Sequence, residues 1–123
     1  MIRAVYFSKE GRKITMYEPM INDQTTPFKG LIDLIPTGRR EAVSMTDLSK
    51  LIGLPSSDVR LMILNARKIG ILICSGDEGY YFPKDDDELK EYRNRRRKYI
   101  RTATIALTPF EDVLNGQKEG DPG

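Results

Sequence analysis

Between residues 44 and 83 the spacing of apolar residues changes several times along the chain. At each change there is a residue type that commonly begins or ends a helix or strand. Ser44 can cap a helix through its hydroxyl, and a stripe at helical spacing follows it, made of Leu48, Leu51 and Ile52. Gly53 and Pro55 then interrupt the stripe, because glycine accepts the left-handed conformation and proline begins a turn. The pattern predicts a helix, a tight turn and a second helix that one of the two serines after Pro55 caps.

The second helix is predicted from a core face at spacings of three and four residues, which consists of Val59, Met62, Ile63, Ala66 and Ile69. Gly70 ends this helix. An apolar strand over 71–74, a polar turn over 75–79 and a return strand over 80–82 then predict a hairpin that Pro83 closes. A helix, a turn, a second helix and a hairpin in this order are typical of a winged helix.

A shorter helix over residues 28–35 precedes these elements, with apolar positions at Leu31, Ile32, Leu34 and Ile35. Pro36 and Gly38 end it, and residues 38–41 form a solvated link to the Ser44 cap. The predicted fold class is therefore α+β and mostly α. It is a winged helix-turn-helix over residues 28–83, with a three-helix core and a β-hairpin wing.

Residues 1–27 form a β-prone N-terminal arm. Its two β-prone runs, 4–7 and 14–17, make either a small hairpin or an edge strand added to the wing sheet, and the sequence leaves both arrangements open.

Residues 84–114 predict a basic C-terminal helix followed by a short apolar patch. Three aspartates at 85–87 suit a helix start, and consecutive positions on a helix point in different directions, so they make a poor metal site. The helix is expected from about Asp86 to about Leu107, where Pro109 stops it. The patch consists of Phe110, Val113 and Leu114 and can fold back on the core. Residues 115–123 are expected to be a disordered tail.

Six cations and no carboxylate lie between Tyr92 and Ile105: Arg93, Arg95, Arg96, Arg97, Lys98 and Arg101. At about 100° per residue they cover most of the circumference, so part of the helix must face solvent or an anionic partner. Two uses follow. Phosphate contacts are expected from Arg93, Arg95, Arg97, Lys98 and Arg101. A dimer seam, which is compatible with those contacts, would use Leu89, Tyr92, Tyr99 and Ala103, and Arg96 interrupts it.

Composition narrows the function classes. The chain has 123 residues, enough for one domain with a modest core, and its net charge of +2 does not demand a nucleic-acid partner. It has no histidine and no phosphate-loop motif, and its single cysteine, Cys74, lies in a predicted strand without a catalytic partner. We therefore expect no enzymatic activity, no cofactor and no metal. The lone cysteine and the absence of a long apolar run favour a cytoplasmic location.

Several short motifs resemble those of one family, and they span residues 28 to about 114. They are Leu31–Pro36, Ala42–Met45, Asp58–Arg60, Ala66–Gly70, Ile73–Gly76, Gly79–Tyr81 and the arginine-rich helix after Glu88. In these motifs the chain resembles small winged-helix proteins encoded by temperate phages and prophages of Gram-positive bacteria. The resemblance implies a DNA-binding accessory role in phage replication or regulation, without enzymatic activity. It identifies no operator sequence.

In the DNA-binding interpretation, the second helix enters the major groove with its N-terminal residues and exposed face. The candidate contacts are Ser56, Ser57, Arg60 and Lys68. Arg60 is the first choice for a guanine edge, although it can equally be a surface charge paired with Asp58. Arg67 and Lys68 can contact phosphate or interact with the C-terminal helix dipole. The hairpin tip Asp77–Glu78 is acidic, so the wing is not expected to enter a minor groove.

Leu61 and Leu64 favour a second interpretation, because they are predicted opposite the core face, where a groove-reading helix should be polar. With Tyr92 and Tyr99 they are candidate protein-interface residues. The alternative function is therefore an adaptor on a winged-helix scaffold, which binds a replication or transcription protein, or a second copy, without reading DNA sequence.

Overall fold

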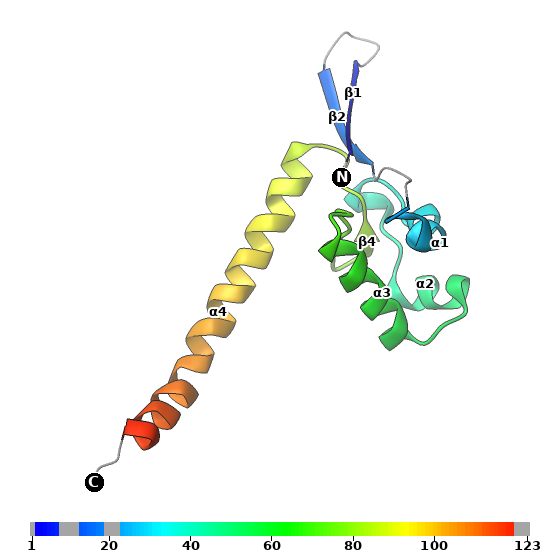
Figure 1. Ribbon diagram of the computed structural model, residues 1–123. Helices are drawn as coiled ribbons and strands as arrows, with labels where there is room; N and C mark the ends of the chain where they lie inside the picture. Colours follow the sequence, from blue (N-terminus) through cyan, green and yellow to red (C-terminus); the bar gives the residue numbers. More distant parts are fainter. Residues whose placement is uncertain (1, 8–12, 19–22, 120–123) are drawn as a thin grey trace. The chain divides into compact units, whose positions relative to one another are not determined.

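The structure is a computed structural model (Figure 1). It describes residues 2–7, 13–18 and 23–119, and the side chains of residues 23–116. The chain divides into two compact units, Met1–Tyr92 and Arg93–Gly123. The described residues are mostly helical with two small antiparallel sheets, which agrees with the predicted α+β class.

The N-terminal arm contains a hairpin of two strands, β1 (Ile2–Phe7) and β2 (Lys13–Glu18). The strands are antiparallel, with Ile2 opposite Glu18 at one end and Phe7 opposite Lys13 at the other. Of the two arrangements that the sequence left open, the small hairpin is the one present. Within the described residues, β1 and β2 pair only with each other.

Two helices begin and end close to the residues that the sequence marked. α1 (Lys29–Leu34) continues a 3₁₀ turn, η1 (Thr26–Phe28), and overlaps the predicted range. α2 (Met45–Ile52) follows Ser44, whose Oγ accepts a hydrogen bond from the Asp47 N–H at 3.1 Å. α2 ends at Gly53, which has a φ of 81°. The Ser44 cap and the Gly53 stop are therefore confirmed.

α3 (Ser56–Lys68) begins at its predicted position but without the predicted serine cap. Pro55 occupies the cap position, and its carbonyl accepts hydrogen bonds from the N–H groups of Asp58 (3.0 Å) and Val59 (3.1 Å). Ser56 and Ser57 lie in the first turn, and no side chain caps the helix. The predicted cap is wrong because the fixed φ of proline already directs the chain into the helix one residue earlier.

One apolar core lies between the helices and the segment that follows α3. Its buried members are Leu31, Ile35, Leu48, Val59, Ile63, Ala66, Ile71, Ile73 and Phe82. Two expected members lie outside it: Leu51 is 62% exposed and Ile69 is 38% exposed. Both are at the C-terminal ends of their helices.

The second hairpin consists of β3 (Cys74–Gly76) and β4 (Gly79–Tyr81), paired from Cys74 opposite Tyr81 to Gly76 opposite Gly79. The first strand starts later than predicted. The Ile71 N–H still donates to the Ala66 carbonyl (3.1 Å), and the Ile73 N–H donates to the Ile71 carbonyl (2.9 Å). Residues 71–73 are therefore still turning away from α3 and cannot extend the ladder.

The segment between α1 and α2 pairs with β4 and its extension, which the sequence did not indicate. Val43 and Tyr80 exchange two backbone hydrogen bonds, of 2.9 and 2.8 Å. The Gly38 N–H donates to the Phe82 carbonyl (2.7 Å), and the Phe82 N–H donates to the Pro36 carbonyl (2.8 Å). The predicted solvated link is wrong for Gly38, which is buried against the extension of β4, and for Arg39, which is half-buried. Arg40 and Glu41 are exposed as predicted.

Gly79 permits this close pairing. Its φ is 131°, and a Cβ at this position would lie 2.1 Å from the Val43 carbonyl oxygen. No other residue type fits here without displacing backbone.

The C-terminal helix, α4 (Asp86–Glu119), is capped as predicted, because Asp85 Oδ1 accepts from the Glu88 N–H at 2.9 Å. It continues through Pro109 instead of stopping there, and Asn115–Glu119 are helical. A proline removes one backbone hydrogen bond, and the turns on either side of it can remain helical. The rest of the predicted tail, residues 120–123, lies outside the described residues. No described helix combines the length and apolarity that a membrane crossing needs.

Candidate nucleic-acid interface

α3 has one buried face and one open face. Val59, Ile63 and Ala66 are buried, and at about 100° per residue the opposite side is centred near Leu61. The exposed residues on that side are Ser57, Asp58, Arg60, Leu61, Leu64, Asn65 and Lys68. Of the predicted contacts, Ser56 is half-buried and the other three are exposed. We call this surface the α3 open face.

Arg60 is the cation of the open face nearest the start of α3. Within the described residues it forms no ion pair with Asp58, although both side chains are exposed. Its guanidinium therefore remains available for a partner. Lys68, at the other end of the open face, is also exposed.

Arg67 has a structural role that neither sequence interpretation included. Its Nε donates to the Ile73 carbonyl at 2.8 Å, and Nη2 lies 3.4 Å from Ser75 Oγ. The guanidinium also lies over the Tyr92 ring, 5.6 Å from its centroid. Arg67 therefore joins the end of α3 to β3 and to the start of α4.

Large apolar side chains interrupt the polar character of the α3 open face. Leu61 is 55% exposed and Leu64 is 47% exposed, as expected from their positions opposite the core. Leu51 and Leu54, at the turn between α2 and α3, are exposed as well. In a major groove, leucine can contact only the apolar thymine methyl, so this face is less polar than a typical reading surface.

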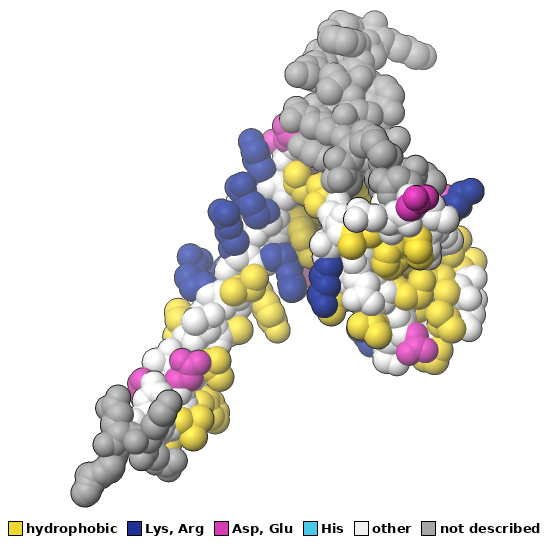
Figure 2. Space-filling view, viewed as in Figure 1, with side chains coloured by type: hydrophobic (Ala, Val, Ile, Leu, Met, Phe, Trp, Pro, Cys, Tyr) yellow, Lys and Arg dark blue, Asp and Glu magenta, His cyan; other side chains and the backbone are white. Residues whose placement is uncertain are grey.

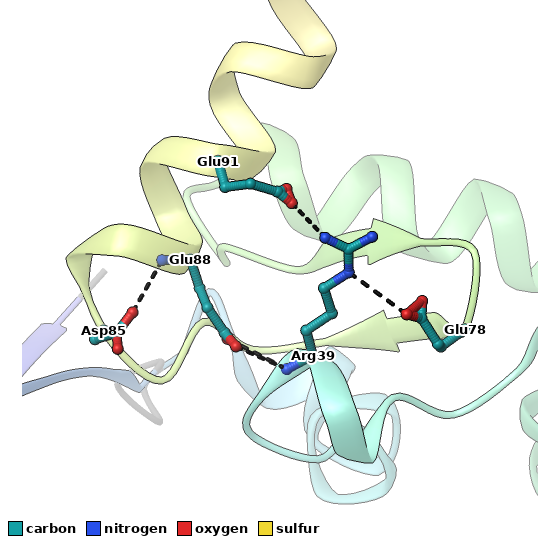
Figure 3. A network of polar contacts seen from close by, with 5 residues as sticks. All are labelled: Arg39, Glu78, Asp85, Glu88 and Glu91. Atoms are coloured by element: carbon teal, nitrogen blue, oxygen red, sulfur yellow. Dashed lines mark hydrogen bonds and ion pairs between the residues drawn. The ribbon is translucent and has the colours of Figure 1, made fainter.

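An acidic cluster around Arg39 ties the β3–β4 hairpin to the start of α4 (Figure 3). Arg39 Nη1 donates to Glu91 Oε1 at 2.7 Å, and Arg39 Nε lies 3.6 Å from Glu78 Oε1. Both carboxylate oxygens of Glu88 accept from the Arg39 backbone N–H at 3.2 Å, and Oε1 also accepts from the Lys84 N–H at 3.1 Å. The acidic hairpin tip is therefore partly neutralised within the molecule. No local sequence pattern indicated these contacts.

The cations of α4 lie in the second unit. We call Arg93, Arg95, Arg96, Arg97, Lys98 and Arg101 the cationic segment; five of them are exposed, and Arg95 is half-buried. Figure 2 shows dark blue side chains along this part of α4. Arg96 lies over the Tyr99 ring, 5.2 Å from its centroid, and Arg93 donates to Asn94 Oδ1. These contacts leave the charges at the surface.

Leu89 and Tyr92, two members of the predicted dimer seam, are half-buried within the first unit. With Arg67, Ile71, Leu72, Ile73 and Cys74 they line a pocket of about 220 Å³. Cys74 is free and buried. Among the described residues, no three or more His, Cys, Asp or Glu side chains are grouped to hold a metal ion.

Comparison with known proteins identifies no relative. No protein-family model, no curated protein and no solved structure matches the chain.

Proposed function

We propose that this protein binds double-stranded DNA as a winged-helix protein, with α3 as its recognition helix. A replication-accessory or regulatory role in a phage or prophage is part of this proposal, and it follows from the resemblance of the sequence motifs alone. The α3 open face carries the proposal. Its backbone is fixed by a buried stripe on one side, and Arg60, Asn65 and Lys68 project from the other.

The order of the elements supports the winged-helix assignment. α1, the paired Val43 segment, α2, α3, β3 and β4 follow one another, and the Val43–Tyr80 hydrogen bonds add a third strand position to the hairpin. A helix-turn-helix backed by such a sheet holds its second helix by the core side alone, which leaves the other side for a groove.

The protein would contact DNA in two ways, through base edges and through phosphates. Arg60 donates two hydrogen bonds to a guanine edge, Asn65 pairs with an adenine, and Leu61 and Leu64 meet thymine methyl groups. The cationic segment contacts phosphates, which gives affinity without sequence information. The hairpin tip stays outside the minor groove, because Asp77 is an exposed carboxylate there.

Fluorescence anisotropy of a labelled mixed-sequence duplex, titrated at several salt concentrations, tests the phosphate contacts. The triple variant Arg95→Ala/Arg97→Ala/Lys98→Ala should bind every duplex more weakly and lower the salt slope by about 3, if each cation contributes about 0.9. Lys29→Ala, an exposed cation on α1, is the matched control and should change neither quantity.

Arg60→Ala should weaken binding to the preferred site, found by selection from a random duplex pool, more than binding to mixed sequence. Unchanged affinity in both the Arg60 variant and the triple variant would refute DNA binding by these surfaces.

The exposed leucines favour a second candidate, a protein-interaction adaptor on the same scaffold. In that case Leu61→Asp abolishes partner binding while duplex affinity is absent or unchanged. If Leu61→Asp instead weakens duplex binding together with Arg60→Ala, the open face contacts DNA and the adaptor proposal fails.

A further inference from the structure

The C-terminal half of α4 carries an apolar stripe that nothing in the described part of its own unit covers. The stripe consists of Tyr99, Ile100, Ala103, Ala106, Leu107, Phe110, Val113 and Leu114, and we call it the α4 stripe. All of these side chains are exposed; Phe110 is 67% and Leu114 is 63% exposed. In the described part of the second unit, α4 is the sole secondary-structure element.

The spacing places these side chains on one side of the helix. Steps of three and four residues keep them within one face, at about 100° per residue. Pro109, Phe110, Val113 and Leu114 line an open apolar groove of about 370 Å³ along it. A helix gains most of its stability in water from packing such a face, so the α4 stripe requires a partner surface.

The charges of α4 are separated along its length. The cationic segment lies before the stripe's midpoint, and Glu111 and Asp112 lie after it; Figure 2 shows the same change from dark blue to magenta. In a parallel pair of α4 helices, six cations would lie beside six cations. In an antiparallel pair, each cationic segment lies beside the other copy's carboxylates.

We propose that two copies of this chain associate through their α4 stripes in antiparallel orientation. The register follows from side-chain size. If the small residues Ala103 and Ala106 lie at the crossing, Tyr99 of one copy is level with Phe110 of the other. Aromatic side chains then pack together on both sides of a close central contact.

The same register matches the charges. Arg97 and Glu111 lie on the same flank of the stripe, and antiparallel pairing brings equivalent flanks together. Arg97 of one copy is then level, to within one residue, with Glu111 of the other. In a parallel pair these two residues would be separated by about 21 Å along the axis, from a rise of about 1.5 Å per residue.

Sedimentation equilibrium of the full chain without DNA tests the association, and its result does not depend on the proposed DNA binding. The wild-type chain should dimerise in the micromolar range, and Phe110→Asp should raise the dissociation constant roughly 10- to 100-fold because a buried aromatic contact is lost. Ile105→Asp is the matched control, since Ile105 is 66% exposed on the opposite side of α4. It should leave the dissociation constant unchanged.

A charge exchange tests the orientation. Arg97→Glu and Glu111→Arg should each weaken the dimer, and the chain that carries both changes should recover it, because the pair is re-formed across the antiparallel interface. Circular dichroism at the same concentrations establishes that each variant keeps its helices. A monomeric wild-type chain, equal effects of Phe110→Asp and Ile105→Asp, or no recovery in the doubly changed chain would overturn the proposal.

Discussion

Gly79→Ala should destabilise the protein strongly, because this glycine meets two separate requirements. Its φ of 131° is a conformation that side chains rarely adopt, and it lies against the Val43 backbone. The unfavourable conformation costs of order 2 kcal/mol. The new Cβ, 2.1 Å from the Val43 carbonyl oxygen, must also displace that strand and break both Val43–Tyr80 hydrogen bonds. At about 1 kcal/mol each, their loss brings the total to about 4 kcal/mol.

Two other glycines separate these contributions. Gly53 has a φ of 81° but nothing within 4 Å of its Cβ position, so Gly53→Ala carries the conformational term alone, about 1–2 kcal/mol. Gly30 lies inside α1, also with nothing within 4 Å, so Gly30→Ala should stabilise by about 0.5–1 kcal/mol. Urea denaturation followed by circular dichroism gives the free energy of unfolding for all three variants.

The order of the three variants is the decisive observation. If Gly79→Ala lowers the free energy of unfolding no more than Gly53→Ala does, the Val43 strand is not held against β4 in solution. The third strand position, on which the winged-helix assignment depends, would then be lost.

Three further changes test other parts of the first unit. Ser44→Ala should lower the free energy of unfolding by about 1 kcal/mol because it removes the α2 cap, whereas Ser57→Ala, which removes no cap, should leave it nearly unchanged in the same titration. Arg39→Met should lower the free energy of unfolding by less than about 1 kcal/mol, since the side chains of the ion pairs are about a third exposed or more. A larger loss, measured by thermal denaturation, would mean that the ion pairs are more shielded from water than the structure shows. Leu61→Asp should change the free energy of unfolding by no more than about 0.5 kcal/mol, and a loss of several kcal/mol in urea denaturation would place Leu61 in the core.

The helices of the first unit were predictable because their signals are local. A serine hydroxyl at 44, a glycine at 53 and a stripe at helical spacing act through residues within one or two turns. The end of α4 was not predictable in this way. Proline is an effective stop signal on average, but Pro109 lies within a helix that continues on both sides of it.

The contacts that complete the first unit join residues distant in sequence, and local patterns do not indicate them. Arg39 was predicted to lie in a solvated link, although its side chain pairs with the carboxylates of Glu78 and Glu91, which are 39 and 52 positions later in the sequence. Val43, beside the Ser44 cap, carried no strand signal, because a single bridge leaves no alternating pattern. For the candidate site, the spacing of apolar residues in the sequence of α3 predicted which side of the helix is open. The contacts of Arg67 were not predictable in this way, because they depend on where β3 and α4 begin.

The hydrogen bonds of the Glu88 carboxylate determine which substitutions its partner residues can tolerate. Because it accepts from the backbone N–H groups of Arg39 and Lys84, the attachment does not depend on either partner's side chain. Any amino acid with an N–H group can replace Lys84 or Arg39 and keep the bond, whereas proline cannot. For these backbone hydrogen bonds, the mutational constraint therefore falls on one residue of the three. Substitution at position 88 should remove them, and positions 39 and 84 can vary without losing them, although a change at Arg39 also removes its side-chain contact with Glu91.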